Sequence, residues 1–485
     1  MNDDNWHQVI TAARRAQRDW RVRPVSRRAA IVGGVRHRLA ADTDGMIDAI
    51  GRRYDRTPAE TLTAEIIPLA DAARFIARSA ARILSPYKLG WRGRPAWLAG
   101  THGDIRRIPF GVIGIIAPGN YRLLLAGVQI LQALAAGNAV IVKPAPGASA
   151  PLVRLRQALL AAGLPAALLS ILSDDHAAGA ALARAPIDKL VLTGSAATGR
   201  AVAADLAERL VPATFELSGD DVVFVLDDAD LDLVAASIAW GLSLNAGATC
   251  IAPRRIYVAR SRLEALTEAL TAHVETRPAR AIDPAVYTRA KARIEAARQA
   301  GWRVIGAPDS ADEPCMRPGI LVDEAARAPV LPGDLFAPLA ALIAVDDSAD
   351  AVARDRRADY ALGASIFGSP AEAERLAQSL EVGVVTINDL IAPSADPRAP
   401  FSGARASGYG VTRGAEGLLA MTRPQTLLER RSRVRAHLQP ASPYDRVLFT
   451  AYLRLIHGRG WRSRLSALKT LLQAGVARMH GTRDQ

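Results

Sequence analysis

The chain has 485 residues, half of them hydrophobic and 22% charged, which excludes a disordered chain and is enough for two or three domains. A net charge of +13 would favour nucleic-acid binding if it were spread over the whole chain. However, residues 430–485 hold 12 Lys and Arg against two Asp and Glu, whereas the rest of the chain has 49 basic and 46 acidic residues. The body is almost neutral, so the composition predicts no nucleic-acid partner.

The cellular location is predicted from the cysteines and from the apolar runs. Cys250 and Cys315 are too few for a disulfide framework, which favours a reducing compartment. Residues 1–20 lack the apolar core of a signal peptide, and no run approaches the ~18 apolar residues of a membrane span. We therefore expect a cytoplasmic protein.

Residues 5–87 have apolar side chains at helical spacing, and their charges mark solvated faces. We expect helices here and no functional site. Residues 89–107 are rich in turns, with short strands between them. A hairpin that projects from a domain often mediates dimerisation, but an ordinary surface loop has the same residue pattern.

Short apolar strands alternate with helices between residues 112 and 217. The expected strands are 112–116, 139–142, 189–192 and 213–217, and the expected helices are 123–136, 151–162 and one that opens within 193–200 and runs to 210. Strands that are apolar throughout, each followed by a helix, predict a parallel, doubly wound α/β sheet whose ligands lie beyond the carboxyl ends of the strands.

The second half repeats this alternation less regularly. The expected strands are 222–225, 255–258, 360–368 and 383–388, and the expected helices are 231–242, 262–274 and 287–300. We place Cys315 in a loop and interpret it as inert, because it has no basic or histidine neighbour. The predicted domains are residues 1–217, 218–407, 408–432 and 433–485.

Polar residues and glycines follow the predicted strands of the first half. Gly194 and Gly199 open a helix, as in diphosphate-binding turns, although a plain tight turn is equally compatible. Lys143 can reach a ribose or a phosphate, or can be a solvated lysine. Asn120 can donate to an oxyanion, or can be a turn residue.

Two further residues carry reactive groups. Glu216 ends a buried strand, where burial would raise its pKa and make it a usable general base. Cys250 lies among small residues that leave a thiolate accessible, but a single cysteine is more often an inert apolar residue. No histidine is spaced to form a Cys–His dyad, and the eight scattered histidines argue against a metal site.

Taken together, these residues form an ordered series of motifs. In the order and spacing of these motifs, the chain resembles the aldehyde dehydrogenase superfamily over residues 5–430. The motifs that carry the resemblance are residues 109–120, 137–144, 193–195 with 199–200, 215–219, 245–250, 334–336 and 400–403. The resemblance implies a Rossmann-type cofactor domain, an α/β catalytic domain and projecting oligomerisation strands.

The resemblance also implies an NAD(P)-dependent oxidation of an aldehyde to a carboxylic acid. Cys250 would add to the aldehyde carbonyl, giving a thiohemiacetal whose oxyanion is held by Asn120 and the backbone N–H of Cys250. Hydride transfer would leave a thioester, which water activated by Glu216 would hydrolyse. There are two alternatives. The first is a CoA-acylating dehydrogenase or acyl-CoA reductase, and Glu216 argues against it because thiolysis needs no such base. The second is a non-catalytic scaffold, and the presence of Asn120, Glu216 and Cys250 together argues against it.

The implied cofactor is NAD or NADP. Gly194, Ser195 and Gly199 would lie against its diphosphate, Lys143 at the adenosine ribose, and Asp334 and Phe336 at the nicotinamide. The remaining implied contacts are Ile116, Ala117, Pro118, Gly119, Pro146 and Leu217. Pro146 stands where the family usually has an acidic residue, so nothing at this position repels the 2′-phosphate of NADP. Asp334 replaces the usual glutamate.

Two segments concern partners. Residues 89–107 match the oligomerisation strands of the family, which implies a homodimer or homotetramer. Residues 433–485 lie outside the resemblance and predict two basic amphipathic helices. Such helices can make a peripheral contact with an anionic membrane, but they dock more often on the protein's own body or on a partner subunit.

Overall fold

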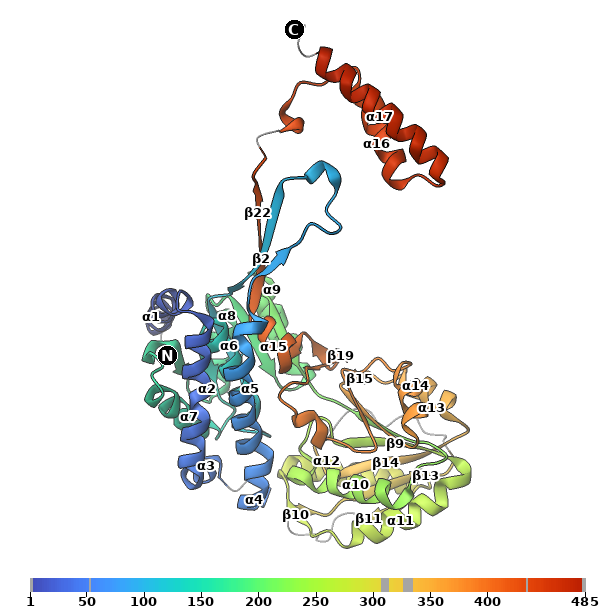
Figure 1. Cartoon of the computed structure of the whole chain (residues 1–485). Helices are drawn as coiled ribbons and strands as arrows, with labels where there is room; N and C mark the ends of the chain where they lie inside the picture. Colours follow the sequence, from blue (N-terminus) through green and yellow to red (C-terminus); the bar gives the residue numbers. More distant parts are fainter. Residues whose placement is uncertain (1–2, 52–53, 307–313, 326–334, 433–434, 482–485) are drawn as a thin grey trace. The chain divides into compact units, whose positions relative to one another are not determined.

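The computed structural model describes residues 3–51, 54–306, 314–325, 335–432 and 435–481 (Figure 1). The chain divides into two compact units. The first comprises residues 1–87 and 106–425, and the second comprises residues 88–105 and 426–485. No described helix is long and apolar enough to cross a lipid bilayer.

The N-terminal part of the first unit is helical, as predicted. Its elements are α1 (Asp3–Arg21), α2 (Val25–Ala41), α3 (Thr43–Ile50), α4 (Pro58–Thr61), the π-turn η1 (Leu62–Ile66) and α5 (Ile67–Ile83). Figure 1 shows α2 and α5 side by side. Polar side chains fix this layer to the next one: Trp20 Nε1 donates to the Leu134 carbonyl at 2.8 Å and Gln17 Nε2 to that of Gly137 at 2.9 Å. Both hydrogen bonds reach carbonyls at the C-terminal end of α6 (Leu124–Ala136), where the helix supplies few donors of its own.

The first sheet has six strands in the order β20-β7-β6-β3-β4-β5. Its strands are β3 (Val112–Ile116), β4 (Ala139–Lys143), β5 (Leu169–Ile171), β6 (Lys189–Thr193), β7 (Ala213–Glu216) and β20 (Gly408–Tyr409). Its helices are α6 (Leu124–Ala136), α7 (Ser149–Ala161), α8 (His176–Arg184) and α9 (Ala196–Ala207). All strand pairs are parallel except β20 with β7, which confirms the predicted doubly wound sheet. Every residue of α6 is buried, as its mainly apolar sequence requires, including Gln129 and Gln132.

The second sheet has seven strands in the order β11-β13-β14-β9-β8-β16-β17. Its strands are β8 (Asp221–Val225), β9 (Pro253–Ala259), β11 (Arg303–Gly306), β13 (Gly319–Asp323), β14 (Leu339–Val345), β16 (Gly363–Phe367) and β17 (Val384–Ile387). One face packs on α10 (Leu231–Ser243) and α11 (Leu263–Glu275), and the other on α13 (Ser348–Asp355) and α14 (Pro370–Ala377). The remaining helices of the first unit are α12 (Pro284–Gln299) and α15 (Gly414–Leu419).

Two predictions differ from the structure because strand pairing is not local in sequence. The sequence predicts one strand over residues 360–368, but β15 (Tyr360–Ala361) pairs with β19 (Ala404–Arg405), and only β16 joins the second sheet. The sequence also places Cys315 in a loop, whereas β12 (Cys315–Met316) pairs with β10 (Arg280–Ala281). The last small pair is β18 (Phe401–Ser402) with β21 (Val411–Thr412).

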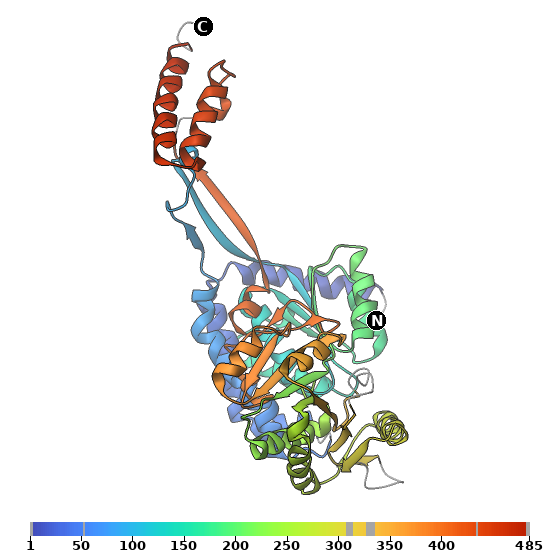
Figure 2. The same ribbon diagram turned by 90° about the vertical axis from the view of Figure 1, so that its right-hand side faces the viewer.

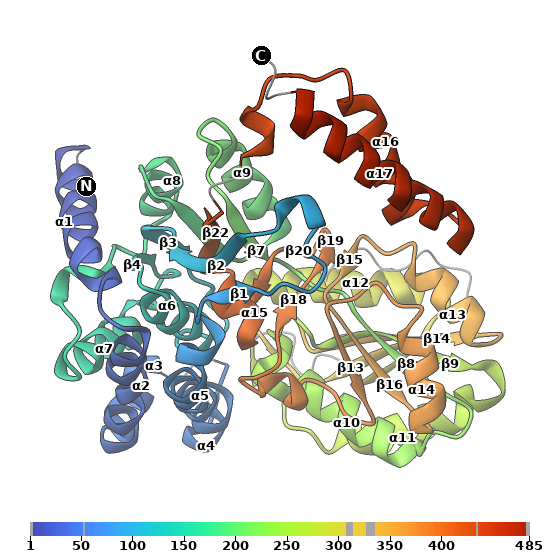
Figure 3. The same ribbon diagram turned by 45° about the horizontal axis from the view of Figure 1, so that its top comes forward.

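The second unit contains a three-stranded sheet and two long helices. The sheet has the order β1-β2-β22, and Figure 2 shows β2 beside β22. Its strands, β1 (Tyr87–Leu89), β2 (Thr101–Pro109) and β22 (Thr422–Arg430), begin or end in the first unit. The helices α16 (Asp445–His457) and α17 (Trp461–Gly481) lie side by side (Figure 3).

Candidate active site

The connection between the two sheets brings Glu216 towards Cys250. Glu216 ends β7 at the carboxyl edge of the first sheet, and the chain then enters β8 at Asp221. Asp221 is paired with Pro253, the first residue of β9, and Cys250 lies three residues before it. At Gly219, a Cβ atom would lie 2.3 Å from the carbonyl oxygen of Cys250, so this close approach requires glycine.

The loop that carries Cys250 is held in a rare backbone conformation. Asn245 and Ala246 have φ values of 53° and 49°, in the left-handed region that non-glycine residues seldom adopt. The side-chain amide of Asn245 donates to the carbonyls of Ala248 (2.9 Å) and Asn120 (3.1 Å). Asn120 Nδ2 also donates to the Ala248 carbonyl, at 3.1 Å. The two amides therefore fix Asn120 against the residues that precede Cys250.

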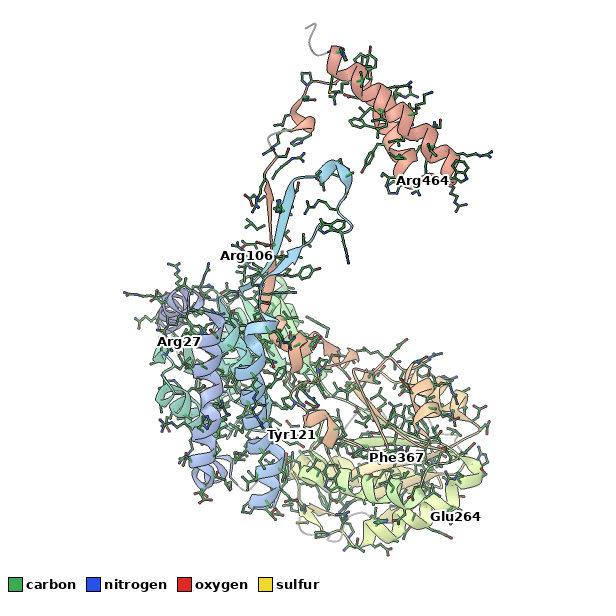
Figure 4. The ribbon with its side chains drawn as sticks, viewed as in Figure 1. Arg27, Arg106, Tyr121, Glu264, Phe367 and Arg464 are labelled. Carbon is green, nitrogen blue, oxygen red and sulfur yellow. The ribbon has the colours of Figure 1, made fainter. Side chains whose placement is uncertain are left out.

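Tyr121 completes this contact. Its hydroxyl lies 2.7 Å from Thr249 Oγ1, and burial raises the pKa of the Tyr121 phenol, so the group is a neutral hydroxyl. Cys250 itself is half-buried. Tyr121, labelled in Figure 4, belongs to the segment between β3 and α6.

Cys250 and Tyr121 line a cavity of about 250 Å³. Its wall is mainly apolar, and Arg413 is its one charged residue among the described side chains. The other lining residues are Thr63, Ala64, Pro68, Leu124, Leu125, Trp240, Leu244, Thr249, Ile251, Ile391, Ala392, Ser394, Ala395 and Phe401. The guanidinium of Arg413 lies 4.8 Å from the ring centre of Phe401 and donates to the Ser394 carbonyl at 2.7 Å.

Glu216 is a buried carboxylate with incomplete hydrogen bonding. Thr412 Oγ1 donates to its Oε2 at 3.3 Å, and Oε1 has no partner among the described residues. Burial raises the pKa of Glu216, while the charge of Arg413 and the hydrogen bond from Thr412 act in the opposite direction. A buried oxygen without a partner is costly, and such groups cluster at functional sites.

A second group of residues lies at the carboxyl ends of β3 and β6. These neighbouring strands mark the point where the strand order reverses, and ligands bind in such crevices. Ile116 ends β3, and Ala117, Pro118 and Gly119 follow it. The Ala117 N–H donates to the Lys143 carbonyl at 2.9 Å, which aligns the end of β4 with this edge.

The turn after β6 suits a diphosphate. The Gly194 N–H donates to the Glu216 carbonyl at 3.0 Å, and Ser195 caps α9 by accepting from the Thr198 N–H at 3.1 Å. At Gly199, a Cβ atom would lie 2.7 Å from Leu217 Cδ1, so a larger residue here would force the Leu217 side chain, just after β7, to shift. The N-terminus of α9 supplies the N–H groups and the positive dipole that an NAD(P) diphosphate requires.

Phe336 lies in the loop before β14, with a φ of 57°. This loop contacts the Cys250 loop: at Gly247, a Cβ atom would lie 2.4 Å from the carbonyl carbon of Ala337. Arg254 Nη1 also donates to the Ala337 carbonyl, at 2.7 Å. Asp334, the other residue expected at the nicotinamide, lies outside the described residues.

Comparison with known proteins agrees with this geometry. The model of the aldehyde dehydrogenase family matches residues 1–427. The 4,4'-diapolycopene aldehyde oxidase of Methylomonas sp is 32% identical over 93% of this chain and 87% of its own. A putative NADP(+) succinate-semialdehyde dehydrogenase of Mycolicibacterium smegmatis is 30% identical over 86% of this chain and 83% of its own.

A solved structure is also similar. The Mycobacterium tuberculosis aldehyde dehydrogenase complexed with NAD+ has a TM-score of 0.81 and 27% identity, covering 89% of this chain and 91% of its own. This chain belongs to the aldehyde dehydrogenase family. It is an oxidoreductase that uses NAD or NADP to oxidise an aldehyde to a carboxylic acid.

The negative charge near Lys143 differs from what the residue at position 146 indicates. Pro146 is exposed, but Asp174, which follows β5, accepts from the Gly147 N–H at 2.9 Å. Burial lowers the pKa of Lys143, while Asp174 and Asp175 raise it. Acidic side chains from the segment between β5 and α8 therefore lie near the lysine of this dehydrogenase, although the sequence has none at position 146.

Several residues of the cavity in this enzyme escape sequence reasoning. Thr63 and Pro68 belong to the helical part where the sequence indicates no site. Trp240 is spaced like a core residue of α10, and Arg413 follows the last motif. Arg413 has a φ of 61° before Gly414, but a positive φ at a non-glycine residue leaves no mark in a sequence. The described residues contain no group of three or more His, Cys, Asp or Glu that could hold a metal ion.

Proposed function

We propose that Cys250, Asn120 and Glu216 carry out the reaction and that the substrate is a bulky, mainly apolar aldehyde. The observation that supports this best is the apolar cavity whose wall includes Cys250. Small-molecule sites have this character, with few polar groups in a largely apolar wall.

The Cys250 thiolate attacks the carbonyl carbon of the aldehyde and forms a C–S bond, and the carbonyl oxygen becomes an oxyanion. Asn120 Nδ2 has two N–H groups, and only one is needed for the Ala248 carbonyl. The second donates to the oxyanion, together with the backbone N–H of Cys250. The Asn245 amide holds Asn120 in position for this step.

The diphosphate of NAD(P) would be held by Gly194, Ser195, Gly199 and Leu217. The crevice beside them would be lined by Ile116, Ala117, Pro118 and Gly119. Further contacts with the cofactor would come from Lys143, Pro146, Asp334 and Phe336. The bound cofactor supplies the acceptor for the hydride that leaves the aldehyde carbon. The Cys250 adduct is then a thioester.

Glu216 removes a proton from water, and the resulting hydroxide attacks the thioester and expels the Cys250 thiolate with the acid. Burial supports this role because it raises the pKa of the carboxylate and makes it a stronger base. Thiolysis by CoA would need no such base, so hydrolysis is the better proposal.

The substrate class is proposed from the cavity and from a relative. The similar Methylomonas protein is named for a long apolar aldehyde, 4,4'-diapolycopene aldehyde. Its match covers 93% of this chain, more than residues 1–427 can supply, so it includes part of the C-terminal extension. Arg413 favours a second candidate, an aldehyde with a distant carboxylate, such as that of the relatives named for succinate semialdehyde.

A panel of aldehydes separates the two candidates. We expect kcat/KM, measured from the absorbance of reduced cofactor with NAD and with NADP, to be higher for long-chain and coniferyl aldehydes than for succinate semialdehyde. Cys250→Ala should lower kcat at least about a thousandfold for every substrate. A preference for succinate semialdehyde that Arg413→Leu abolishes would overturn the apolar assignment and support the second candidate.

We also propose that the enzyme is cytoplasmic and forms a homodimer or homotetramer through residues 89–107. Residues 1–217 would form the cofactor domain, 218–407 the catalytic domain, 408–432 a return segment with an oligomerisation strand, and 433–485 an extension. Light scattering on the full chain should give the mass of two or four subunits; a single-subunit mass would contradict the proposed assembly.

A further inference from the structure

The helices α16 and α17 pack on each other through small side chains. Ala451 of α16 and Ala467 and Ala474 of α17 are buried. Ala467 and Ala474 are seven residues apart, about two helical turns, so both lie on the side of α17 that faces α16. Because alanines fill this seam, most large apolar side chains of both helices lie outside it.

Nine of these side chains are exposed, and we name them together the apolar face. On α16 it consists of Phe449, Leu453 and Ile456. On α17 it consists of Trp461, Leu465, Leu468, Leu472, Val476 and Met479. Trp461 is 68% exposed and Leu472 is 62% exposed, values unusual for residues of this size. Soluble proteins rarely leave so large an apolar patch without a binding role.

The two stripes face the same side of the helical pair. Leu448 and Leu455 are half-buried on the same side of α16 as Ala451. On each helix the exposed stripe lies roughly between a third and a half of a turn beyond this buried side in the direction of the chain, as the 3.6-residue repeat shows. Residues 458–460 connect the helices by a short loop, so they run antiparallel. In an antiparallel pair, equal rotations from a shared seam point to one side. On α17, Ser466 and Gln473 point away from that side and are exposed.

Basic residues surround the apolar face. Residues 444–481 contain Arg446, Arg454, Arg459, Arg462, Arg464, Lys469 and Arg478. Their single acidic residue, Asp445, lies 3.0 Å from Arg478. Arg464, labelled in Figure 4, lies near the start of α17. A face of this composition matches the surface of a bilayer that contains anionic phospholipids, with apolar side chains among the acyl chains and arginines at the headgroups.

We propose that the apolar face binds the surface of an anionic membrane, with α16 and α17 lying in its plane. Charge argues against a second copy as the occupant, because pairing two apolar faces would bring their surrounding arginines together. Anionic headgroups neutralise the same charges. This inference rests on the helical pair alone and does not depend on the proposed substrate or catalytic residues.

The test is co-sedimentation of the full chain with phosphatidylcholine vesicles that contain about 30 mol% phosphatidylglycerol, and with pure phosphatidylcholine vesicles. We expect binding to the anionic vesicles at low salt, weakening as salt rises. The double variant Leu465→Asp/Leu472→Asp should lower the partition coefficient at least about tenfold. Its matched control is Ser466→Asp/Gln473→Asp, which adds the same two charges at neighbouring exposed positions outside the apolar face.

The control should retain more binding than the double variant, and both should keep dehydrogenase activity on a short soluble aldehyde, which shows that they fold. Failure of the unaltered chain to bind anionic vesicles would overturn the proposal, as would an equal loss in the two variants. A smaller assembly of the Leu465→Asp/Leu472→Asp variant in light scattering, without vesicle binding by the unaltered chain, would instead identify the apolar face as a subunit interface.

Discussion

Among single residues, Glu216 depends most on its surroundings. A solvated glutamate is a weak base, but this carboxylate is buried at the end of β7 with one oxygen lacking a partner among the described residues. Two opposing influences set its pKa: burial raises it, and the nearby charge of Arg413 lowers it. Because only the ionised form can take a proton from water, the rate of thioester hydrolysis should follow this balance.

Removing the charge of Arg413 should shift the pH dependence of kcat. Glu216 is active when deprotonated, so kcat should rise with pH through a pKa above the ordinary glutamate value. Arg413→Leu removes a lowering influence, so it should move this rise to higher pH. Arg398→Leu, which removes an exposed arginine paired with Asp396, is the control and should leave the profile in place. An unchanged profile in Arg413→Leu would contradict the coupling.

The choice between NAD and NADP should respond to Asp174. Its carboxylate accepts from Gly147 and Ser149 and lies near Lys143, so it would repel a 2′-phosphate bound there. We expect Asp174→Asn to raise the ratio of kcat/KM for NADP to that for NAD several-fold. Asp205→Asn, near the far end of α9, should leave the ratio unchanged. A lower ratio in Asp174→Asn would exclude this role.

At the scale of elements, the N-terminus of α6 depends on a residue from another segment. Glu65, in η1, accepts from the N–H groups of Leu123 and Leu124 at 2.6 and 3.2 Å. It satisfies donors that the first turn of a helix leaves without partners and places a negative charge at the positive end of the dipole. The segment with Asn120 and Tyr121 immediately precedes this turn, so η1 positions part of the active site.

Arg56→Met should destabilise the enzyme strongly. Arg56 Nη2 lies 2.6 Å from Glu65 Oε1, and the two side chains are 1% and 0% exposed. Loss of one partner leaves a buried charge uncompensated, which costs about 3–5 kcal/mol in the free energy of unfolding. Urea denaturation measures this. Arg154→Met removes a pair of similar length, 2.6 Å to Asp42, whose partners are 38% and 47% exposed, and should change stability far less. Similar losses in both variants would show that burial does not govern the effect.

At the scale of the whole molecule, the candidate active site and most of the net positive charge belong to different segments of the chain. The described residues that form the candidate site all belong to residues 63–413. Most of the net positive charge belongs to residues 430–485. Catalysis and surface binding are therefore expected to be separable functions of one polypeptide.

A chain that ends at residue 432 should retain catalysis on a short soluble aldehyde and lose binding to anionic vesicles. Its kcat/KM should stay within about twofold of the full chain, because the truncation removes no residue of the cavity. Its thermal midpoint should be compared with that of the full chain to verify folding. A loss of activity without a loss of stability would mean that the extension contributes to catalysis.

The sequence predicts most of the first sheet, since continuous apolar strands and regular helices are local patterns. Helix α8 escapes prediction because it is short and, apart from Leu182, has only small apolar side chains. Cys250, Asn120, Glu216 and the Gly194 turn are recognisable because each has a distinctive residue type beside a predictable strand end. Thr63, Trp240 and Arg413 have no such signal, and their positions in the cavity wall could not be predicted.

By itself, then, the sequence determined the family and the α/β class and supplied the residues proposed to carry the reaction, because these depend on short motifs and on the periods of helices and strands. Only the tertiary structure decided that Gly219 contacts the Cys250 backbone, that Asp174 lies near Lys143 and that the large apolar residues of α17 remain exposed. The physical reason is that these properties come from packing between segments far apart along the chain, or from which face of a helix its neighbour covers. No local pattern records either of them.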